Sequence, residues 1–246
     1  MIIRHPQKAD MPQLKALWME AFAEPSEAVD AFLETAFFPE NSLLLLWGSG
    51  VAAALYWLDA QCCGKKLACL YAVAVKKDCR GRGLGITLLE EACKVLKGRG
   101  YEGVLLIPGD ESLYTYYNKV GFAPFGHAQK VLAESGEEGL PLQAVNGQTY
   151  LSVRKSLFPG IHWDEPTARY LQRYCRLFAG QDFVLALDGT SVQEYLGKPE
   201  HLPKLLHTLK IDRITARLPG GAQPAGMVRF LNEEFLLPDY FGPMMD

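Results

Sequence analysis

The first 155 residues combine two apolar patterns, one with the spacing of a helix and one of short strand-like runs. Helical spacing predicts four helices, near residues 12–22, 27–38, 84–98 and 111–120. Apolar runs bounded by glycine, proline or charge predict seven strands, at residues 2–4, 42–47, 51–58, 64–75, 103–108, 122–131 and 150–155. Asp10 is predicted to cap the first helix, with Pro12 inside its first turn. The order β-α-α-β-β-β-α-β-α-β-β indicates the α+β class.

The pattern starts again beyond Pro159. The segments there are an amphipathic stretch at 164–178, a strand at 183–187, a helix at 201–209, a strand at 211–218 and a loop at 219–224. A chain of 246 residues is long for one average domain and short for two full ones. We therefore predict two domains, residues 1–155 and a smaller α+β domain at residues 156–246.

The stretch between the predicted strand 64–75 and the helix 84–98 carries the clearest chemistry. It reads Arg80-Gly81-Arg82-Gly83-Leu84-Gly85, after the charged turn Lys76-Lys77-Asp78-Cys79. Glycine leaves the backbone bare, so its N–H groups can approach a ligand closely. The helix start adds unpaired amides and the positive end of the helix dipole. Together with the basic side chains, this predicts a site for a phosphate or a diphosphate.

Two common phosphate-binding motifs do not fit this stretch. A nucleoside-triphosphate loop ends in Gly-Lys-Ser/Thr, whereas Gly85 is followed by Ile86 and Thr87. A dinucleotide fingerprint needs a glycine three residues beyond Gly83 or Gly85, where Ile86 and Leu88 stand. Both readings are therefore excluded.

The pattern Arg80-x-x-Gly83-x-Gly85 after Val73-Ala74-Val75 resembles the acyl-CoA signature of the GCN5-related N-acetyltransferase (GNAT) superfamily. A second motif, Leu-Tyr-Thr-Tyr-Tyr-Asn-Lys-Val-Gly-Phe at 113–122, resembles the family helix that ends in Tyr-x-x-x-Gly-Phe. The resemblance implies the GNAT fold with a mixed sheet and acetyl-CoA as co-substrate. It assigns the general acid to Tyr117 and coenzyme binding to Val73, Ala74, Val75, Arg80, Gly81, Arg82, Gly83, Leu84, Gly85 and Ile86.

Further similarities point to the enhanced-intracellular-survival type of multidomain acetyltransferase. They are the opening segment IIRHPQKADMPQLKALWMEAF, the aromatic second helix and the segment 106–113. In the superfamily the first two helices lie over the acceptor, so Trp18, Phe22 and Phe37 are candidates for its pocket; the alternative is an ordinary core. The second domain has two interpretations, a truncated GNAT-like repeat without a coenzyme or an unrelated α+β cap.

Acetyl transfer to an amine requires a base, because an alkyl ammonium with a pKa near ~10 must lose a proton before it attacks. Many relatives carry a glutamate on the strand before the glycine turn, but residues 67–75 contain no carboxylate. The candidates left open are Glu24, Asp30, Glu34, His127 and the terminal carboxylate of Asp246. Backbone amides around Val75 are predicted to stabilise the oxyanion.

Three more residues near the second motif are predicted to have structural roles. Asp110 stands where many members have an asparagine, and it is predicted to cap the following helix. Tyr114 and Tyr116 flank the predicted acid and are expected to pack the helix.

Composition narrows the class of protein. The net charge of −3 argues against a nucleic-acid partner. The six cysteines show no metal-ligand spacing, so no metal is expected. Without an apolar leader or long apolar run, we expect a cytoplasmic protein with no membrane partner. The predicted activity is N-acetyl transfer to the primary amine of a small molecule or a peptide lysine. The alternative is a catalytically silent CoA-binding or assembly module, and homo-oligomerisation is left open.

Overall fold

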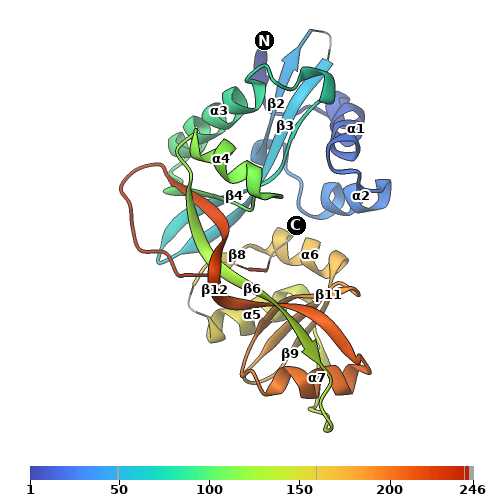
Figure 1. Cartoon of the computed structure of the whole chain (residues 1–246). Coiled ribbons are helices and arrows are strands. Elements are labelled where there is room, and N and C mark those ends of the chain that lie inside the picture. Colours follow the sequence, from blue (N-terminus) through green and yellow to red (C-terminus); the bar gives the residue numbers. More distant parts are fainter. Residues whose placement is uncertain (49, 159, 241, 244–246) are drawn as a thin grey trace. The chain divides into compact units, whose positions relative to one another are not determined.

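The computed structural model describes residues 1–48, 50–158, 160–240 and 242–243, and it divides the chain into two compact units (Figure 1). Unit 1 consists of Met1–Ala123 together with Val228–Glu234, and unit 2 consists of Pro124–Met227 with the residues from Phe235 on. These bounds differ from the predicted ranges 1–155 and 156–246 in two ways: residues 124–155 belong to unit 2, and the chain returns to unit 1 at Val228–Glu234.

Unit 1 is built on a mixed sheet. Its strands, in spatial order, are β1 (Ile2–Arg4), β2 (Ser42–Trp47), β3 (Gly50–Cys62), β4 (Lys65–Val75), β5 (Gly103–Leu106) and the end of β12 (Arg213–Phe230). The pairs β1–β2, β2–β3 and β3–β4 are antiparallel, and β4–β5 is parallel. Directly after β12, the Leu231 N–H donates to the carbonyl of Glu102 at 2.9 Å. This return segment completes the sheet.

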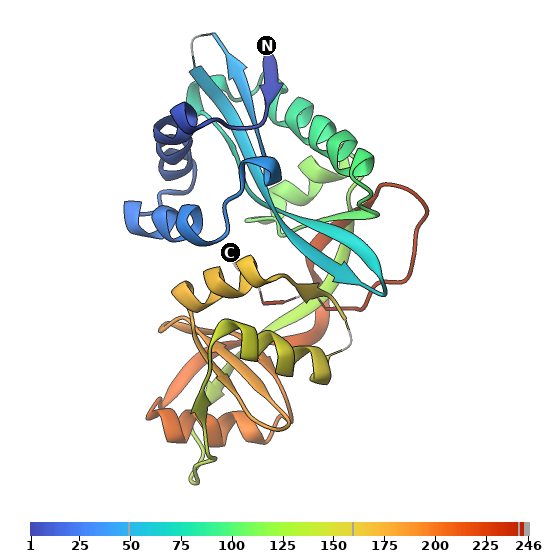
Figure 2. The ribbon, with the colours of Figure 1, turned by 180° about the vertical axis from the view of Figure 1, so that it is seen from behind.

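Helices cover both faces of this sheet (Figures 1 and 2). One side carries α1 (Met11–Phe22) and α2 (Ser26–Thr35), and the other carries α3 (Leu84–Gly98) and α4 (Glu111–Asn118). The apolar residues of α3 that recur at helical spacing are buried, as the sequence pattern predicts: Leu84, Leu88, Leu89, Ala92 and Leu96. The order of helices and strands up to α4 agrees with the prediction.

Asp10 occupies the N-cap position of α1 as predicted, but it does not cap the helix with its side chain. Its backbone is already helical, and its side chain makes no capping bond to α1. Instead, its carboxylate accepts the Gln7 N–H at 2.7 Å and pairs with Arg4 at 2.7 Å. It therefore closes the short 3-10 turn η1 (Lys8–Asp10) that leads into α1, while Pro12 does lie in the first turn of α1.

Unit 2 has a sheet of its own. Its elements, in chain order, are β6 (Ala123–Glu134), β7 (Gln143–Ala144), α5 (Gly147–Leu157), β8 (His162–Trp163), α6 (Glu165–Tyr174), β9 (Arg176–Ala179), β10 (Val184–Leu187), β11 (Ser191–Leu196), α7 (His201–Leu209) and most of β12. The strands lie in the order β7-β9-β10-β11-β12, and β6 also pairs with β12. The β11–β12 pair is parallel.

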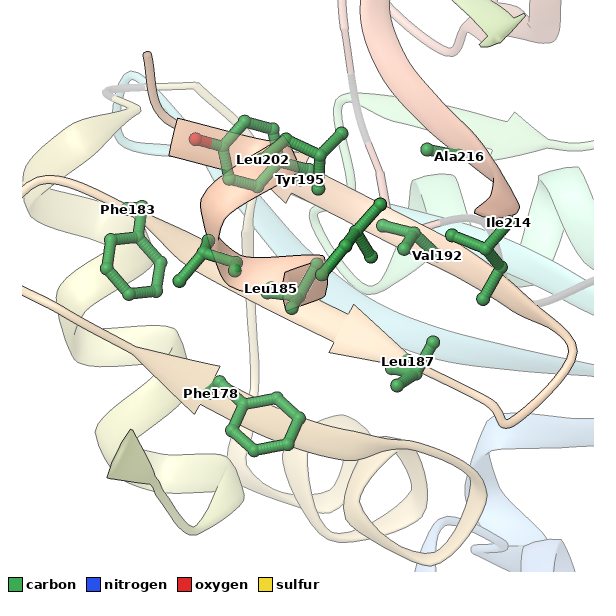
Figure 3. Packing of buried hydrophobic residues seen from close by; sticks show 11 residues of the cluster. Phe178, Phe183, Leu185, Leu187, Val192, Tyr195, Leu202, Ile214 and Ala216 are labelled. Atoms are coloured by element: carbon green, nitrogen blue, oxygen red, sulfur yellow. The ribbon is translucent and has the colours of Figure 1, made fainter. Parts of the chain in front are cut away.

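The core of unit 2 lies between this sheet and α7 (Figure 3). Leu185 and Leu187 alternate along β10 and are at most 1 % exposed. They share a cluster with Leu202, Leu205 and Leu206 of α7. The strand period of two and the helix spacing of three to four therefore bring one apolar face of each element together.

Two expectations for this half are wrong. Residues 150–155 form part of helix α5 rather than a closing strand, and 219–224 lie inside β12 rather than in a loop. The side chain of Asn146 accepts the Thr149 N–H at 2.8 Å and caps α5. Tyr150 and Arg154, one turn apart, are both buried, which is the helical period.

Candidate functional site

Strand β4 has one edge that is only partly paired. It pairs with β5 at Leu67, Ala68 and Cys69, and this register ends at the Cys69–Leu105 pair. On its other side it stays paired with β3 as far as Val75. The described ladders therefore give residues 70–75 no partner on the β5 side, which leaves backbone groups available to an extended ligand.

A bulge determines which amides face this open edge. The β3–β4 register shifts between Ala54 and Tyr56, and Ala72 on β4 has a φ of 47°. Beyond the bulge, the Lys76 N–H donates to the carbonyl of Ala52 on β3 at 2.8 Å. Since backbone groups alternate along a strand, Val73 and Val75 point to the other edge. The Val75 carbonyl accepts a hydrogen bond there from Arg80 Nε at 3.1 Å.

The glycine turn follows this edge directly. Gly81 and Gly83 have φ values of 76° and 74°, and Gly83 begins α3 without a side-chain cap. The first bond of the helix runs from the Thr87 N–H to the Gly83 carbonyl at 3.0 Å. The six amides of residues 81–86 have no acceptor among the described residues. A Cβ on Gly81 or Gly83 would meet nothing within 4 Å, so the surface above these amides is open.

The turn also carries positive charge. Lys76, Lys77 and Arg82 are exposed, and no ion pair joins their side chains to a carboxylate in the described part of the chain. The carboxylate of Glu20 instead accepts the backbone N–H of Lys77 at 2.7 Å and fixes the turn against α1. Unpartnered amides and unpaired cations give this turn the chemistry to bind an anion.

The predicted acid, Tyr117, lies near the end of α4. It is 7 % exposed, and its ring packs edge-on against Phe122 and Tyr116. Burial raises the pKa of its hydroxyl above the ordinary value, so the group is protonated at neutral pH. Arg229 holds this end of α4, because its guanidinium donates to the Val120 carbonyl at 2.7 Å and to Glu90 at 2.9 Å. A proton donor is therefore held on a fixed helix end.

Tyr116 is closer to the glycine turn than its predicted packing role suggests. Its hydroxyl lies 2.5 Å from where a Cβ on Gly85 would stand, and a methyl of Val75 lies 3.2 Å from the same point. The hydroxyl thus joins the start of α3 to the end of β4. The glycine at position 85 is the sequence signal for a close contact there, but it does not indicate that Tyr116 makes the contact.

Gly85→Ala is expected to lower the free energy of unfolding by about 1 kcal/mol, since the new methyl overlaps the Tyr116 hydroxyl. Tyr116→Phe removes the overlapping oxygen and leaves the ring carbon at 3.7 Å, an ordinary contact. In thermal denaturation, the double variant should therefore be more stable than the sum of the single effects. Strict additivity would mean that the two side chains do not meet.

The aromatic candidates for an acceptor pocket fall into different environments. Trp18 is 2 % exposed and packs against Phe32, Tyr56 and Tyr71. Phe22 is 42 % exposed, and Phe37 is partly buried. Trp18 thus belongs to the core beneath α1 and α2, and Phe22 is the most accessible of the three.

The candidate bases in unit 1 already have partners. Glu24 accepts the indole N–H of Trp18 at 3.0 Å. Asp30 pairs with Lys15 at 2.5 Å, and this partner holds the pKa of its carboxyl below the usual value. Glu34 is partnered as well. These contacts therefore give no reason to single out one of the three carboxylates as the base.

Two candidate bases, His127 and the terminal carboxylate, and the predicted helix cap Asp110 remain to be placed. His127 belongs to unit 2, where its Nδ1 lies 2.5 Å from Asp239. The terminal carboxylate of Asp246 lies outside the described residues. Asp110 caps α4 as predicted, because its carboxylate accepts the Ser112 N–H at 2.8 Å.

Among the described residues, no three His, Cys, Asp or Glu side chains are placed to hold a metal ion. The helices in the described ranges are all too short or too polar to cross a lipid bilayer.

Known structures share this fold. A GCN5-related N-acetyltransferase from Anabaena variabilis is 16 % identical with a TM-score of 0.71, covering 94 % of this chain and 73 % of that one. A putative acetyltransferase from Pyrococcus horikoshii is 16 % identical with a TM-score of 0.70, covering 93 % and 89 %. Eis1 from Mycobacterium abscessus is 10 % identical with a TM-score of 0.68, covering 94 % and 74 %.

At these identities the similarity establishes the fold, and its coverage extends over both units. None of the curated proteins is a match for this sequence. The family model described as "Acetyltransferase (GNAT) domain" matches residues 2–125, which is half of the chain and includes both motifs. The chain therefore belongs to the GNAT family of acetyltransferases.

Proposed function

We propose that this protein is an acetyl-CoA-dependent N-acetyltransferase that acetylates a primary amine of a small molecule or of a peptide lysine. The proposal rests on two groups of available backbone amides. Val73 and Val75 supply one group at the open edge of β4, and residues 81–86 supply the other, after the short turn η3 (Lys77–Cys79). An extended ligand that ends in a diphosphate matches the two groups in order and in charge.

In this proposal the coenzyme is held mainly by backbone. The amides of the glycine turn bind its diphosphate, and Arg80 and Arg82 add positive charge beside it. Val73 and Val75 bind the pantetheine arm through the edge that β5 leaves open, and Ala74 between them pairs with Ala54 and keeps this part of β4 in the sheet. Leu84 and Ile86 contribute their amides at the start of α3. The coenzyme supplies the activated acetyl group as a thioester.

The chain's own groups then assist a direct transfer in a ternary complex. A Val75 or Val73 amide donates to the acetyl oxygen as it becomes an oxyanion. Tyr117 donates its proton to the leaving sulfur, which requires the neutral phenol that burial maintains. The base that deprotonates the amine stays unassigned between Glu24, Asp30, Glu34, His127 and the terminal carboxylate.

Two further features support the proposed compartment and the proposed subtype of the enzyme. The six cysteines are free thiols, which fits a reducing, cytoplasmic compartment. The sequence motifs and the fold shared with Eis1 support the enhanced-intracellular-survival subtype. Unit 2 keeps both of its interpretations, a truncated GNAT-like repeat and an unrelated cap.

The second candidate function is a catalytically silent CoA-binding or assembly module. It is favoured by one observation, that residues 67–75 carry no carboxylate while Glu24 and Asp30 are engaged elsewhere. Release of free CoA thiol, measured with polyamines, aminoglycosides and lysine peptides, separates the two functions. Acceptor-dependent release supports the enzyme, and tight CoA binding without release supports the silent module.

Tyr117→Phe is expected to lower kcat by about 100-fold, a typical contribution of a general acid, while the affinity for acetyl-CoA stays within about twofold. The ring and its packing against Phe122 are retained, so stability should change little. Tyr114→Phe on the same helix is the matched control and should retain its kcat. Equal kcat values for the Tyr117 variant and the unmodified protein would remove this hydroxyl from the mechanism.

A further inference from the structure

The turn between β3 and β4 holds two adjacent cysteines that the proposed function does not use. Cys62 is the last residue of β3 and pairs with Lys65 across the hairpin. Cys63 follows it and is the one exposed residue among the six cysteines, all of which are described. The two Sγ atoms are 3.7 Å apart. The pair is therefore a dithiol with one accessible sulfur.

The backbone at this turn disfavours a side chain. Cys63 has a φ of 51° and Gly64 a φ of 75°, which is the pattern of a type I′ turn. Asn-Gly or Gly-Gly is preferred there, and other residues cost about 1–2 kcal/mol in the left-handed region. A thiol at such a position suggests a requirement beyond the fold.

The distance between the sulfurs distinguishes two kinds of product. Two sulfurs bonded to one atom at about 2.3 Å are about 3.3–3.8 Å apart, from the near-right angle of a pyramidal atom to the tetrahedral angle, and the observed 3.7 Å lies within this range. A disulfide needs sulfurs about 2.05 Å apart and Cα atoms usually more than 4.4 Å apart. Adjacent Cα atoms are only about 3.8 Å apart. The pair thus fits a bridging atom better than a direct bond.

The turn supplies only two sulfur ligands, so the other bonds of the bridging atom must be made to groups that do not come from the protein. A closed zinc site needs four protein ligands, but no group of three candidate ligands occurs in the described structure. A trivalent arsenical with one organic substituent needs only two sulfur bonds, since its third bond is to carbon. The two thiols of this turn supply the two sulfur bonds that such an arsenical needs.

We propose that Cys62 and Cys63 form a binding site for thiophilic agents of this class, monosubstituted trivalent arsenicals. Two S–H bonds and the arsenic–oxygen double bond break, two arsenic–sulfur bonds form, and the oxygen leaves as water with both thiol protons. No electrons are transferred, so no oxidant is required. The exposed Cys63 reacts first, and Cys62 then closes the ring.

The second step is intramolecular, which compensates for the low reactivity of Cys62. Burial and the neighbouring thiol raise the pKa of Cys62 to about 12, so it enters the reaction as a thiol. Once Cys63 holds the arsenic, the neighbouring sulfur acts at a high effective concentration. The ring should therefore resist competition by monothiols.

The site is independent of the proposed coenzyme site. Cys62 and Cys63 lie before the start of β4, and the glycine turn lies after its end. The eleven residues of β4 span roughly 35 Å. Acetyl-CoA binding is therefore expected to be the same with and without the arsenical. Failure of the dithiol proposal would leave acetyl-CoA binding unchanged, and failure of the proposed function would leave the arsenical adduct unchanged.

The experiment treats the folded full-length chain with phenylarsine oxide and follows intact mass. We expect one phenylarsenic adduct that survives excess 2-mercaptoethanol and is removed by dithiothreitol. In Cys63→Ser and in Cys62→Ala, the fraction that survives 2-mercaptoethanol should fall at least about tenfold, because the second attachment is lost. Cys79→Ser, which removes the partly exposed thiol of the glycine turn, should keep the resistant adduct.

Three results would overturn the proposal. They are no adduct on the folded chain, an adduct that forms only after denaturation, and a resistant adduct that persists in Cys63→Ser. Thermal denaturation of the variants shows that they are folded, and Cys63→Ser is expected to be neutral because its side chain is exposed.

Discussion

Gly83→Val is expected to weaken acetyl-CoA binding by at least about 100-fold, which corresponds to the loss of one or two charge-assisted hydrogen bonds. Gly83 has a φ of 74° and lies within the row of unpartnered amides. A valine there would place two methyl groups where the diphosphate approaches, and it would also resist the left-handed conformation. Isothermal titration calorimetry with acetyl-CoA measures the effect.

The conformational part of this effect needs its own control, and the chain offers one. Gly100 has a φ of 77°, and a Cβ there would also meet nothing within 4 Å. It lies beyond the other end of α3, whose 15 residues span about 22 Å. Gly100→Val should therefore carry the same backbone cost, about 1–2 kcal/mol, and still bind acetyl-CoA normally.

The comparison separates strain from ligand contact. If both variants lose binding equally, the loss reflects a general disturbance of α3 rather than contact with the ligand. If both bind normally, the diphosphate is held elsewhere, and the proposed function loses its main support. Only loss in the Gly83 variant alone agrees with the proposal.

The glycine turn could be predicted because its chemistry is local. A strand, a run of glycines and a helix start determine which amides lack partners, and all three features are consecutive in the sequence. Helix α7 was predicted with its observed bounds, 201–209, for the same reason. Its apolar residues follow one helical face, and that face is the one that packs in the core of unit 2.

Features that depend on distant segments were missed. The open edge of β4 exists because β5 stops pairing after Leu105, which no pattern within β4 reveals. The strand that completes the sheet of unit 1 comes from the end of β12, more than 100 residues beyond β5. The place in the sheet that the sequence pattern predicts for residues 150–155 is filled by β12. The identity of the base stays open, because contacts with residues distant in the sequence determine the surroundings of each candidate carboxylate.

A buried ion pair in unit 2 leads to the largest expected change in stability. Arg154 and Glu194 are 1 % and 0 % exposed, and Arg154 Nε lies 2.9 Å from Glu194. The guanidinium also donates to the Ile161 and Gly242 carbonyls, and Tyr150 donates to Glu194 at 2.6 Å. The pair thus joins α5 and β11 to the chain segment that follows β12.

Glu194→Gln keeps the volume of the side chain but leaves a buried guanidinium without a counter-ion. Breaking one partner of such a pair costs about 3–5 kcal/mol. In a chain of this size, each 1 kcal/mol lowers Tm by about 2–4 °C, so a fall of roughly 6–20 °C is expected. Differential scanning calorimetry measures this fall in Tm. Arg154→Met introduced into the Glu194→Gln variant should cost less stability than Arg154→Met in the unmodified protein, because no buried charge is then left unpaired.

The matched control is an exposed pair in the same unit. Arg169 and Glu165 on α6 are 2.8 Å apart, but their side chains are 49 % and 66 % exposed. Glu165→Gln makes the same chemical change at nearly the same distance, and it should cost less than about 1 kcal/mol because water solvates the freed charge. Burial is then the variable that separates the two substitutions. Equal losses of stability would show that the Arg154–Glu194 pair is solvated, and the C-terminal segment would no longer be held by a desolvated charge.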